Sequence, residues 1–325
     1  MTHQIFRGTL KQILPLILLF STCALAGCCL GPIDSSSPPT SPDSPVQIPP
    51  SDLKVGGKVA FQSNQAGNLQ IFVLDLEDQQ LTQLTTSGSN NVEPAWSPDG
   101  TRIAYVCGVN DTRADLCTMQ ADGDGNVHLT EREGAVGTPR WSPDGSRIMF
   151  HAFWDGNPIK LYVVNADGSD LTETPVGPGN NLWADWSPDG TRIVFVSDRD
   201  GNDEIYVANS DGSGATRLTQ SSTRDRFPRW STDGERILFV SSRDGMPRLF
   251  TIKPDGQNLE PITDTKGQDG VATWADGGKW IIFATARGIA DQDTGTLMVL
   301  DVGTGEMATL LGNVPGKEDF PDWKP

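Results

Sequence analysis

Histidine and basic residues are scarce in this chain. Its 325 residues include three histidines, at positions 3, 128 and 151, too few for a metal centre built from several histidine ligands. Lys and Arg together number 25 against 42 Asp and Glu, a formal net charge of −17. A chain this acidic repels nucleic acid and anionic lipid headgroups, so no nucleic-acid partner is expected.

Aromatic residues and long apolar segments are also few. Hydrophobic residues make up 36% of the chain and aromatic residues 7%, while 35 Gly and 23 Pro interrupt it throughout. Turns must therefore be frequent and regular elements short, which disfavours a helix bundle or a coiled coil. A single all-β domain of more than 250 residues is compatible with this composition.

Catalytic motifs are missing as well. The sequence contains no G-x-S-x-G nucleophile elbow. A Ser-His-Asp set would have to use His128 or His151, which fall in predicted strands and are expected to be partly buried and structural. We therefore predict no catalytic residue, no metal and no cofactor. The enzymatic alternative is a polysaccharide hydrolase or lyase that uses acids such as Asp185, Asp225 or Asp322.

The N-terminus is typical of an export signal. Within residues 1–27, Arg7 and Lys11 precede an apolar run over 13–20 that is too short to span a bilayer. The segment is therefore predicted to direct export and to be absent from the mature protein.

A lipid attachment motif follows the apolar run. Leu25-Ala26-Gly27-Cys28 resembles the lipobox of bacterial lipoproteins at all four positions, which implies cleavage before Cys28 and lipid, such as palmitate, on its sulfur. The alternative is an ordinary signal peptide cleaved near Ala26. Residues 28–55 are rich in Pro and Ser and cannot bury enough apolar surface to fold, so they are predicted to be a tether.

Residues 56–325 are periodic. The sequence Trp-Ser-Pro-Asp-Gly-x-Arg-Ile starts at Trp96 and recurs at Trp141 and Trp186, weaker copies start at Trp230 and Trp274, and a last fragment contains Trp323. The spacings between these tryptophans are 45, 45, 44, 44 and 49 residues. A period of this length with short strands in each unit is typical of β-propeller blades.

The fourth unit predicts four antiparallel strands, over 184–187, 192–197, 204–208 and 216–219. Six copies of the second strand occur, but the first has no Trp before it and the last Trp has no such strand after it. We expect the C-terminal strand at 320–324 to pair with the strands near 58–84. The predicted fold is therefore an all-β, six-bladed β-propeller with four-stranded antiparallel blades, closed as a ring by this pairing.

These motifs resemble the propeller repeat of the TolB family. The resemblance covers about residues 56–325 and rests on the Trp-Ser-Pro-Asp-Gly copies together with patterns such as Ser197-Asp198-Arg199-Asp200-Gly201-Asn202. It implies six blades and protein partners in the cell envelope, among them a flexible peptide segment entering the channel. The chain departs from the family by carrying a lipobox and a tether where the family has an N-terminal α/β domain.

The loops before the inner strands supply the candidate binding site. Five residues before the repeated Trp, polar or acidic residues occur in five of the six copies: Asn91, Asn181, Asp225, Asp269 and Glu318. Repetition around a propeller would arrange them as a ring at the channel mouth, with Trp183 and Arg226 as further anchors for a peptide. The alternative is that these side chains bind the backbone of their own loops.

Two tryptophans fall outside the repeat. Trp154 and Trp183 are expected at the surface, where they could stack on a glycan, whereas the repeated tryptophans are expected to pack between adjacent blades. A glycan-binding propeller is thus a second alternative.

Two cysteines remain once the N-terminal ones are assigned. Cys107 and Cys117 lie on neighbouring predicted strands, and an oxidising envelope compartment favours a disulfide between them. The alternative is two reduced, buried thiols. A metal site is not expected, because no other thiol or nearby histidine would complete it.

Together these features predict an envelope lipoprotein. The propeller would be monomeric, on the periplasmic or extracellular side of a membrane, anchored through Cys28, and would act as a scaffold for a protein or peptide.

Overall fold

The computed structural model describes residues 55–110, 112–154, 158–264, 268–286, 295–311 and 317–325. The predicted signal and almost all of the predicted tether lie outside these residues. Within them, the regular elements are strands, apart from a short 3₁₀ turn, η2, at Asp276–Gly278. No helix in the described ranges is long and apolar enough to cross a membrane.

One sheet joins the two ends of the described chain. Its strand order is β24-β1-β2-β3, and its members are β1 (Lys58–Ser63), β2 (Gln70–Asp75), β3 (Leu81–Gln83) and β24 (Glu318–Lys324). The C-terminal strand β24 pairs antiparallel with β1, with Val59 opposite Trp323.

Three further sheets have four strands each in sequence order. They consist of β12 (Asn181–Trp186), β13 (Arg192–Ser197), β14 (Glu204–Asn209) and β15 (Thr216–Arg217); of β16 (Asp225–Trp230), β17 (Ile237–Ser241), β18 (Arg248–Ile252) and β19 (Glu260–Pro261); and of β20 (Asp269–Ala275), β21 (Trp280–Thr285), β22 (Thr296–Asp301) and β23 (Met307–Thr309).

The remaining strands form one eight-stranded sheet. They are β4 (Asn90–Trp96), β5 (Arg102–Val109), β6 (Arg113–Gln120), β7 (Val127–His128), β8 (Gly134–Trp141), β9 (Arg147–Phe153), β10 (Lys160–Asn165) and β11 (Thr172–Thr174). Its two antiparallel halves, β4–β7 and β8–β11, are joined by a short parallel pairing of β6 with β8.

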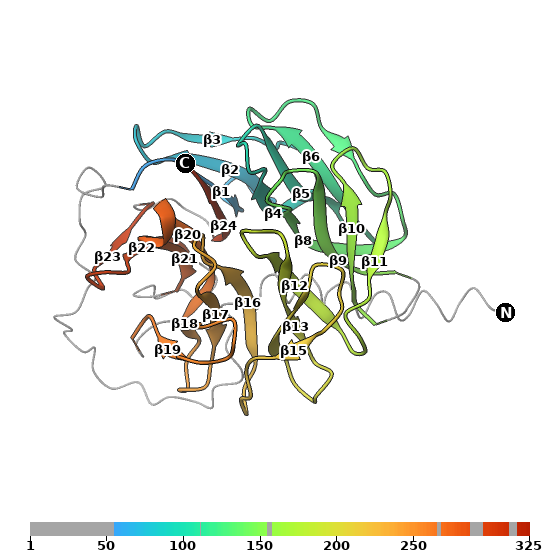
Figure 1. Ribbon diagram of the computed structural model, residues 1–325. Coiled ribbons are helices and arrows are strands. Elements are labelled where there is room, and N and C mark those ends of the chain that lie inside the picture. The colour runs from blue at the N-terminus through green and yellow to red at the C-terminus, as the bar shows by residue number, and fades with distance from the viewer. Residues whose placement is uncertain (1–54, 111, 155–157, 265–267, 287–294, 312–316) are drawn as a thin grey trace, which may run out of the picture.

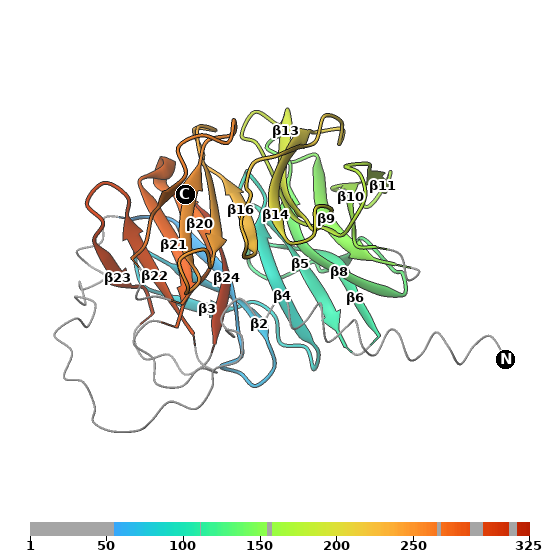
Figure 2. The same ribbon diagram turned by 90° about the horizontal axis from the view of Figure 1, so that it is seen from below.

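The sheets stand around a common axis (Figure 1). The first strands of the units line the centre, and contacts run from β24 to β4, β8, β12, β16, β20 and back to β24. Turned by 90°, the strands run lengthwise through a short, wide disc (Figure 2). The prediction of an all-β propeller with antiparallel four-stranded blades is thus confirmed.

The strand predictions for the fourth unit match closely at the second strand. β13 covers the predicted residues 192–197, and β14 begins at the predicted Glu204. The inner strand β12 begins three residues earlier than predicted, because its register shifts between Leu182 and Asp185, where Trp183 has a φ of 51°. Such a bulge inserts a residue and hides the period-two pattern of a strand.

The Ser-Pro-Asp-Gly part of the repeat is a self-bonded turn. In the third copy, Ser187 Oγ donates to Asp189 Oδ1 at 2.6 Å, and the Thr191 amide donates to the same oxygen at 3.0 Å. These bonds, first that from Ser187, lower the pKa of Asp189 to about 2. Gly190 has a φ of +69°, a conformation that glycine adopts without strain. This part of the motif therefore needs no ligand to explain it.

The Trp and Arg of the repeat connect neighbouring units. The Arg of one copy lies over the indole ring of the next, as Arg102 does over Trp141 at 4.5 Å from the ring centroid. The same contact recurs in three further pairs: Arg147 with Trp186, Arg192 with Trp230, and Arg236 with Trp274. The contacts agree with the expected packing of the repeated tryptophans between blades.

Candidate functional site

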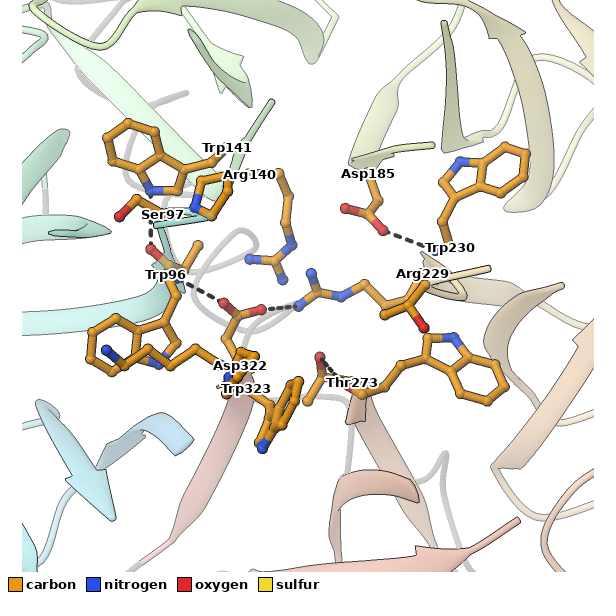
Figure 3. A pocket seen from close by; sticks show the side chains of 16 residues that line it. Trp96, Ser97, Arg140, Trp141, Asp185, Arg229, Trp230, Thr273, Asp322 and Trp323 are labelled. Carbon is orange, nitrogen blue, oxygen red and sulfur yellow. Dashed lines mark hydrogen bonds and ion pairs between the residues drawn. The ribbon is translucent and has the colours of Figure 1, made fainter. Parts of the chain in front are cut away.

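A cavity of about 290 Å³ opens at the end of the inner strands, next to the Trp-Ser-Pro-Asp turns (Figure 3). All the inner strands contribute to its lining. The residue immediately before each repeated Trp lines it, and these residues are Ala95, Arg140, Asp185, Arg229, Thr273 and Asp322. Five of the repeated tryptophans, Trp96, Trp141, Trp230, Trp274 and Trp323, also line this axial pocket.

Two guanidinium groups and two carboxyl groups meet in the axial pocket. Asp322 Oδ1 lies 3.6 Å from Arg229 Nη2, and Asp322 Oδ2 accepts a 2.7 Å hydrogen bond from the Trp96 amide. Across the pocket, Asp185 Oδ2 accepts from the Trp230 amide at 2.9 Å. The guanidinium groups of Arg140 and Arg229 point toward one another at the centre (Figure 3).

Burial changes the charge balance of the axial pocket. It raises the pKa of Asp185 to about 6 and also raises that of Asp322, while the positive charge of Arg140 opposes both shifts. Arg229 is 8% exposed at its side chain, and its Nη2 atom has no hydrogen-bond partner among the described residues. The Asp322 carboxylate at 3.6 Å offsets the charge of Arg229 but is too far from Nη2 to accept a hydrogen bond, so the pocket is suited to a ligand that brings a closer acceptor, above all a carboxylate.

Aromatic side chains close the axis behind the pocket. Five residues at the third position before the repeated Trp have a positive φ: Glu93, Thr138, Trp183, Phe227 and Phe320. The rings of Trp183 and Phe227 lie 4.5 Å apart, and those of Phe227 and Phe320 lie 6.0 Å apart. A void of about 10 Å³ separates Trp183 and Phe227 from the two arginines. Behind the two arginines, the axis is therefore occupied by the aromatic rings of Trp183, Phe227 and Phe320.

The predicted mouth residues lie at the other end of the inner strands. Asn91, Asn181, Asp225, Asp269 and Glu318 are all buried. Each has partners inside the fold. The two asparagines donate hydrogen bonds, Asn91 to Gln70 and Ser87, and Asn181 to the carbonyls of Gly177 and Gly179. The three acids are paired as well: Asp225 forms an ion pair with Arg243, Asp269 accepts a hydrogen bond from Thr285, and Glu318 accepts one from Ser63. Asn181 thus binds the backbone of its own loop, as the alternative expected, whereas Asp225, Asp269 and Glu318 bind side chains outside their own loops. The role of the five residues in binding a peptide stays a prediction.

The predicted aromatic anchors are differently placed from what we expected. The expectation that Trp154 and Trp183 lie at the surface is wrong, since each is 4% exposed. Trp154 packs against Tyr162, and Trp183 belongs to the axial aromatic layer. Arg226 donates from Nε to Asp203 at 2.6 Å and lies over the Trp183 ring.

The cysteines and histidines require one correction. Cys107 and Cys117 are joined by a disulfide, with Cα atoms 5.9 Å apart. The expectation that no histidine lies near them is wrong: His128 in β7 stands opposite Cys117, with Nδ1 3.8 Å from Cys107 Sγ. His151 is buried, which lowers its pKa to about 3.

Sequence reasoning missed Arg140, Arg229 and Thr273. The available signal was variation inside a regular repeat, because the position before the Trp reads Ala, Arg, Asp, Arg, Thr and Asp in successive copies. If packing between blades determined this position, the same residue type would recur in every copy, as the Trp does. Its variation therefore indicates a different role.

Comparisons with known proteins agree with the fold. The family model described as TolB beta propeller domain matches residues 109–325. The chain belongs to this family. The curated TolB homologs of Chlorobaculum tepidum and Chlorobium luteolum are each 41% identical over 51 residues, which is 16% of this chain and 12% of the relative. The match thus spans a small part of those relatives' length.

Solved structures resemble the TolB-like propeller over most of the chain. TolB from Acinetobacter baumannii superposes with a TM-score of 0.72 and 23% identity, covering 83% of this chain and 67% of that one. A putative TolB from Agrobacterium tumefaciens gives 0.66 and 20%, covering 83% and 99%. An oligogalacturonate lyase in complex with manganese gives 0.52 and 18%, covering 78% and 73%. At these identities the likeness concerns the fold.

Proposed function

We propose that this protein is an envelope lipoprotein whose TolB-like propeller is a non-enzymatic scaffold that binds a segment of a partner protein in the axial pocket. The observation that carries the proposal is Arg229, a buried cation in a cavity lined by indole rings, whose Nη2 atom makes a 3.6 Å ion pair with Asp322 but donates no hydrogen bond among the described residues. Indoles and arginines are the side chains most enriched at the energetic centre of protein interfaces.

The propeller is proposed to be a closed ring of six blades and a monomer. The eight-stranded sheet divides into two four-stranded blades at the short β6–β8 pairing, and β24 completes the blade of β1–β3. The circular contacts of the inner strands support this count. In such a ring the residue before each repeated Trp reaches the axis from a different blade, which explains how six residues far apart in sequence line one pocket.

The proposed ligand is a peptide segment that presents a carboxylate. A carboxylate between Arg140 and Arg229 would accept hydrogen bonds from both guanidinium groups, and the surrounding tryptophans would cover its apolar neighbours. Asp185 and Asp322 also line the pocket, and their carboxylates accept hydrogen bonds. The bound segment must therefore also supply hydrogen-bond donors, as the N–H groups of a polypeptide backbone do.

Binding to a peptide array tests this proposal. The array would hold peptides with and without an acidic residue or a free C-terminal carboxylate, and the mature chain would be the probe. We expect binding only to carboxylate-bearing peptides, weakened at least about tenfold in Arg229→Gln. Arg224→Gln is the matched control, because the Arg224 side chain is 61% exposed and outside the pocket. Equal binding by both variants would refute the site.

The anchor is proposed to be lipid on Cys28, with residues 1–27 removed, 28–55 as the tether and 56–325 as the propeller. Val55, the first described residue, is already 3% exposed and packs in the core beside Val59. Metabolic labelling with an alkynyl fatty acid should label the wild type and Cys29→Ser but not Cys28→Ser. Labelling of Cys28→Ser would exclude this anchor.

The glycan-active alternative has one observation in its favour. Asp185 and Asp322 share a pocket with two arginines, the kind of arrangement that could hold an acidic sugar chain. Asp225, the third acid considered, is buried with Arg243 and does not line this pocket. Turnover of oligogalacturonate that is lost in Asp185→Asn would favour this alternative over the scaffold.

A further inference from the structure

The disulfide lies in a cluster of four side chains that can ligate a metal. In the neighbouring strands β5, β6 and β7, Cys107 stands opposite Asp115, and Cys117 stands opposite His128. Residues opposite one another, and residues two apart along one strand, project from the same face of a sheet. The register therefore brings all four side chains together on one face.

The distances from His128 are close to those of a small tetrahedral site, and the two sulfurs would reach such a spacing once their bond is broken. His128 Nδ1 lies 3.8 Å from Cys107 Sγ and 3.8 Å from Asp115 Oδ2. One ligand atom from each of Cys107, Cys117 and His128 lies within 4.8 Å of the others. With Zn–S bonds of about 2.3 Å and Zn–N bonds of about 2.1 Å, ligand atoms around tetrahedral Zn²⁺ are about 3.6 Å apart.

Asp115 supplies an observation that is independent of the two sulfurs. Its side chain is 6% exposed, and its Oδ1 atom has no hydrogen-bond partner among the described residues, while Oδ2 accepts from Arg113. Arg113 offsets the carboxylate charge at Oδ2, but the buried Oδ1 atom without a donor is costly, and a cation bound at Oδ1 would remove that cost. The His128 side chain is 44% exposed, so a cation can reach the cluster from solvent.

We propose that reduction of the Cys107–Cys117 disulfide converts this cluster into a Zn²⁺ site with two thiolates, His128 and Asp115 as ligands. A dithiol reductant supplies two electrons and two protons, which break the S–S bond into two thiols, and the reductant closes its own disulfide. Zn²⁺ then displaces the two thiol protons to solvent. Thiolate and imidazole ligands favour Zn²⁺ over Ca²⁺ and Mg²⁺.

Zinc binding by the mature chain tests this proposal. The protein would be reduced with a phosphine, which binds Zn²⁺ weakly, and titrated with Zn²⁺ against a chromophoric chelator at pH 7. We expect one equivalent bound by the reduced protein and none by the oxidised protein. Substitution with Co²⁺ should give the visible absorption of a tetrahedral thiolate site, which a structural disulfide alone would not produce.

Two variants separate the proposed ligands from their surroundings. His128→Ala should bind Zn²⁺ at least about tenfold more weakly, since a ligand is lost. Val127→Ala should bind as the wild type does, because Val127 is 51% exposed and its side chain projects from the opposite face. If the reduced chain unfolds, Zn²⁺ added before reduction should preserve its near-UV circular dichroism. No binding or protection after reduction, or equal binding by His128→Ala, would overturn the proposal.

Discussion

Phe320 in the C-terminal strand β24 packs edge-on against Phe227 in β16, with ring centroids 6.0 Å apart. Phe320 is 1% exposed, so its whole side chain is part of the core. Further along β24, Trp323 Nε1 donates to the Gly56 carbonyl at 2.9 Å. The last residues therefore contact both an inner strand and the first described residues of the chain.

Deletion of residues 320–325 should destabilise the whole propeller. The deletion removes a buried Phe, the Trp323 contact and most of the β1–β24 pairing. Loss of one large buried side chain alone costs about 3–5 kcal/mol, which is comparable with the net stability of many domains. Urea unfolding followed by circular dichroism measures the effect. Removal of the exposed Pro325 alone is the control, and an unchanged midpoint for the longer deletion would contradict this prediction.

Arg192→Ala should weaken the contact between two neighbouring blades. The guanidinium carbon lies 4.8 Å from the ring centroid of Trp230, and the Arg side chain also covers apolar surface. We expect the free energy of unfolding to fall by about 1–2 kcal/mol. Lys253→Ala, at an exposed turn, should change it by no more than about 0.5 kcal/mol. Equal effects of the two substitutions in thermal unfolding would argue against a contribution from the Arg–Trp pair.

The propeller architecture could be predicted because the same local chemistry repeats. Asp189 and Gly190 fix a turn by bonds within a few residues, and Arg192–Ser197 contains a short run of β-branched and aromatic residues next to turn residues, so both features are visible in the sequence. The start of β12 could not be read in the same way. The positive φ of Trp183 arises from packing around the axis, and no local pattern encodes it.

The axial pocket was harder to predict for a different reason. Arg140, Asp185 and Asp322 lie far apart in sequence and meet only when the inner strands surround one axis. The sequence singles out Asp185 and Asp322 as separate candidate acids, but it does not show that they share one pocket with Arg140 and Arg229. His128 was missed similarly, because its proximity to Cys107 depends on strand register rather than on spacing.

The stability of the propeller should be greatest near pH 4 to 5. Burial raises the pKa of Asp185 to about 6, of Asp319 to about 7 and of Glu318 to about 8. The folded chain holds these protons more tightly than the unfolded chain does. Their contribution is therefore fully present below about pH 4 and is lost as the pH rises through 6 to 8.

The aspartates of the Ser-Pro-Asp-Gly turns have lowered pKa values, so they stabilise the fold at higher pH and lose this contribution at low pH. Hydrogen bonds from Ser97 and Ser142 lower the pKa of Asp99 and of Asp144 to about 2, so their contribution is present above about pH 4 and lost as the pH falls to 2. Melting temperatures from pH 2 to 9 would show the maximum. A melting temperature that rises steadily to pH 9 would contradict it.

Glu318→Gln isolates one of the buried carboxyl groups. Because the neutral amide cannot ionise, the variant should melt higher than the wild type at pH 8, by about 2 °C or more, and should lose this advantage at pH 4. Glu306→Gln removes the same charge from an exposed turn and controls for the overall negative charge of the chain. The same gain in both variants would show that net charge, rather than burial of Glu318, causes the pH dependence.

Gly137 is required because His151 occupies the space of a side chain. A Cβ atom at position 137 would lie 2.5 Å from His151 Nε2, and the ring is held in the core. Gly137→Ala should therefore lower the free energy of unfolding by about 1–3 kcal/mol. At Gly88 a Cβ would meet nothing within 4 Å, so Gly88→Ala should change stability little.

The double variant Gly137→Ala, His151→Ala tests whether the contact is the cause. Without the His151 ring the added methyl group has room, so the double variant should lose about 1 kcal/mol less stability than the sum of the two single variants. Strict additivity in chemical unfolding would show that the contact with His151 is not the reason for glycine at this position.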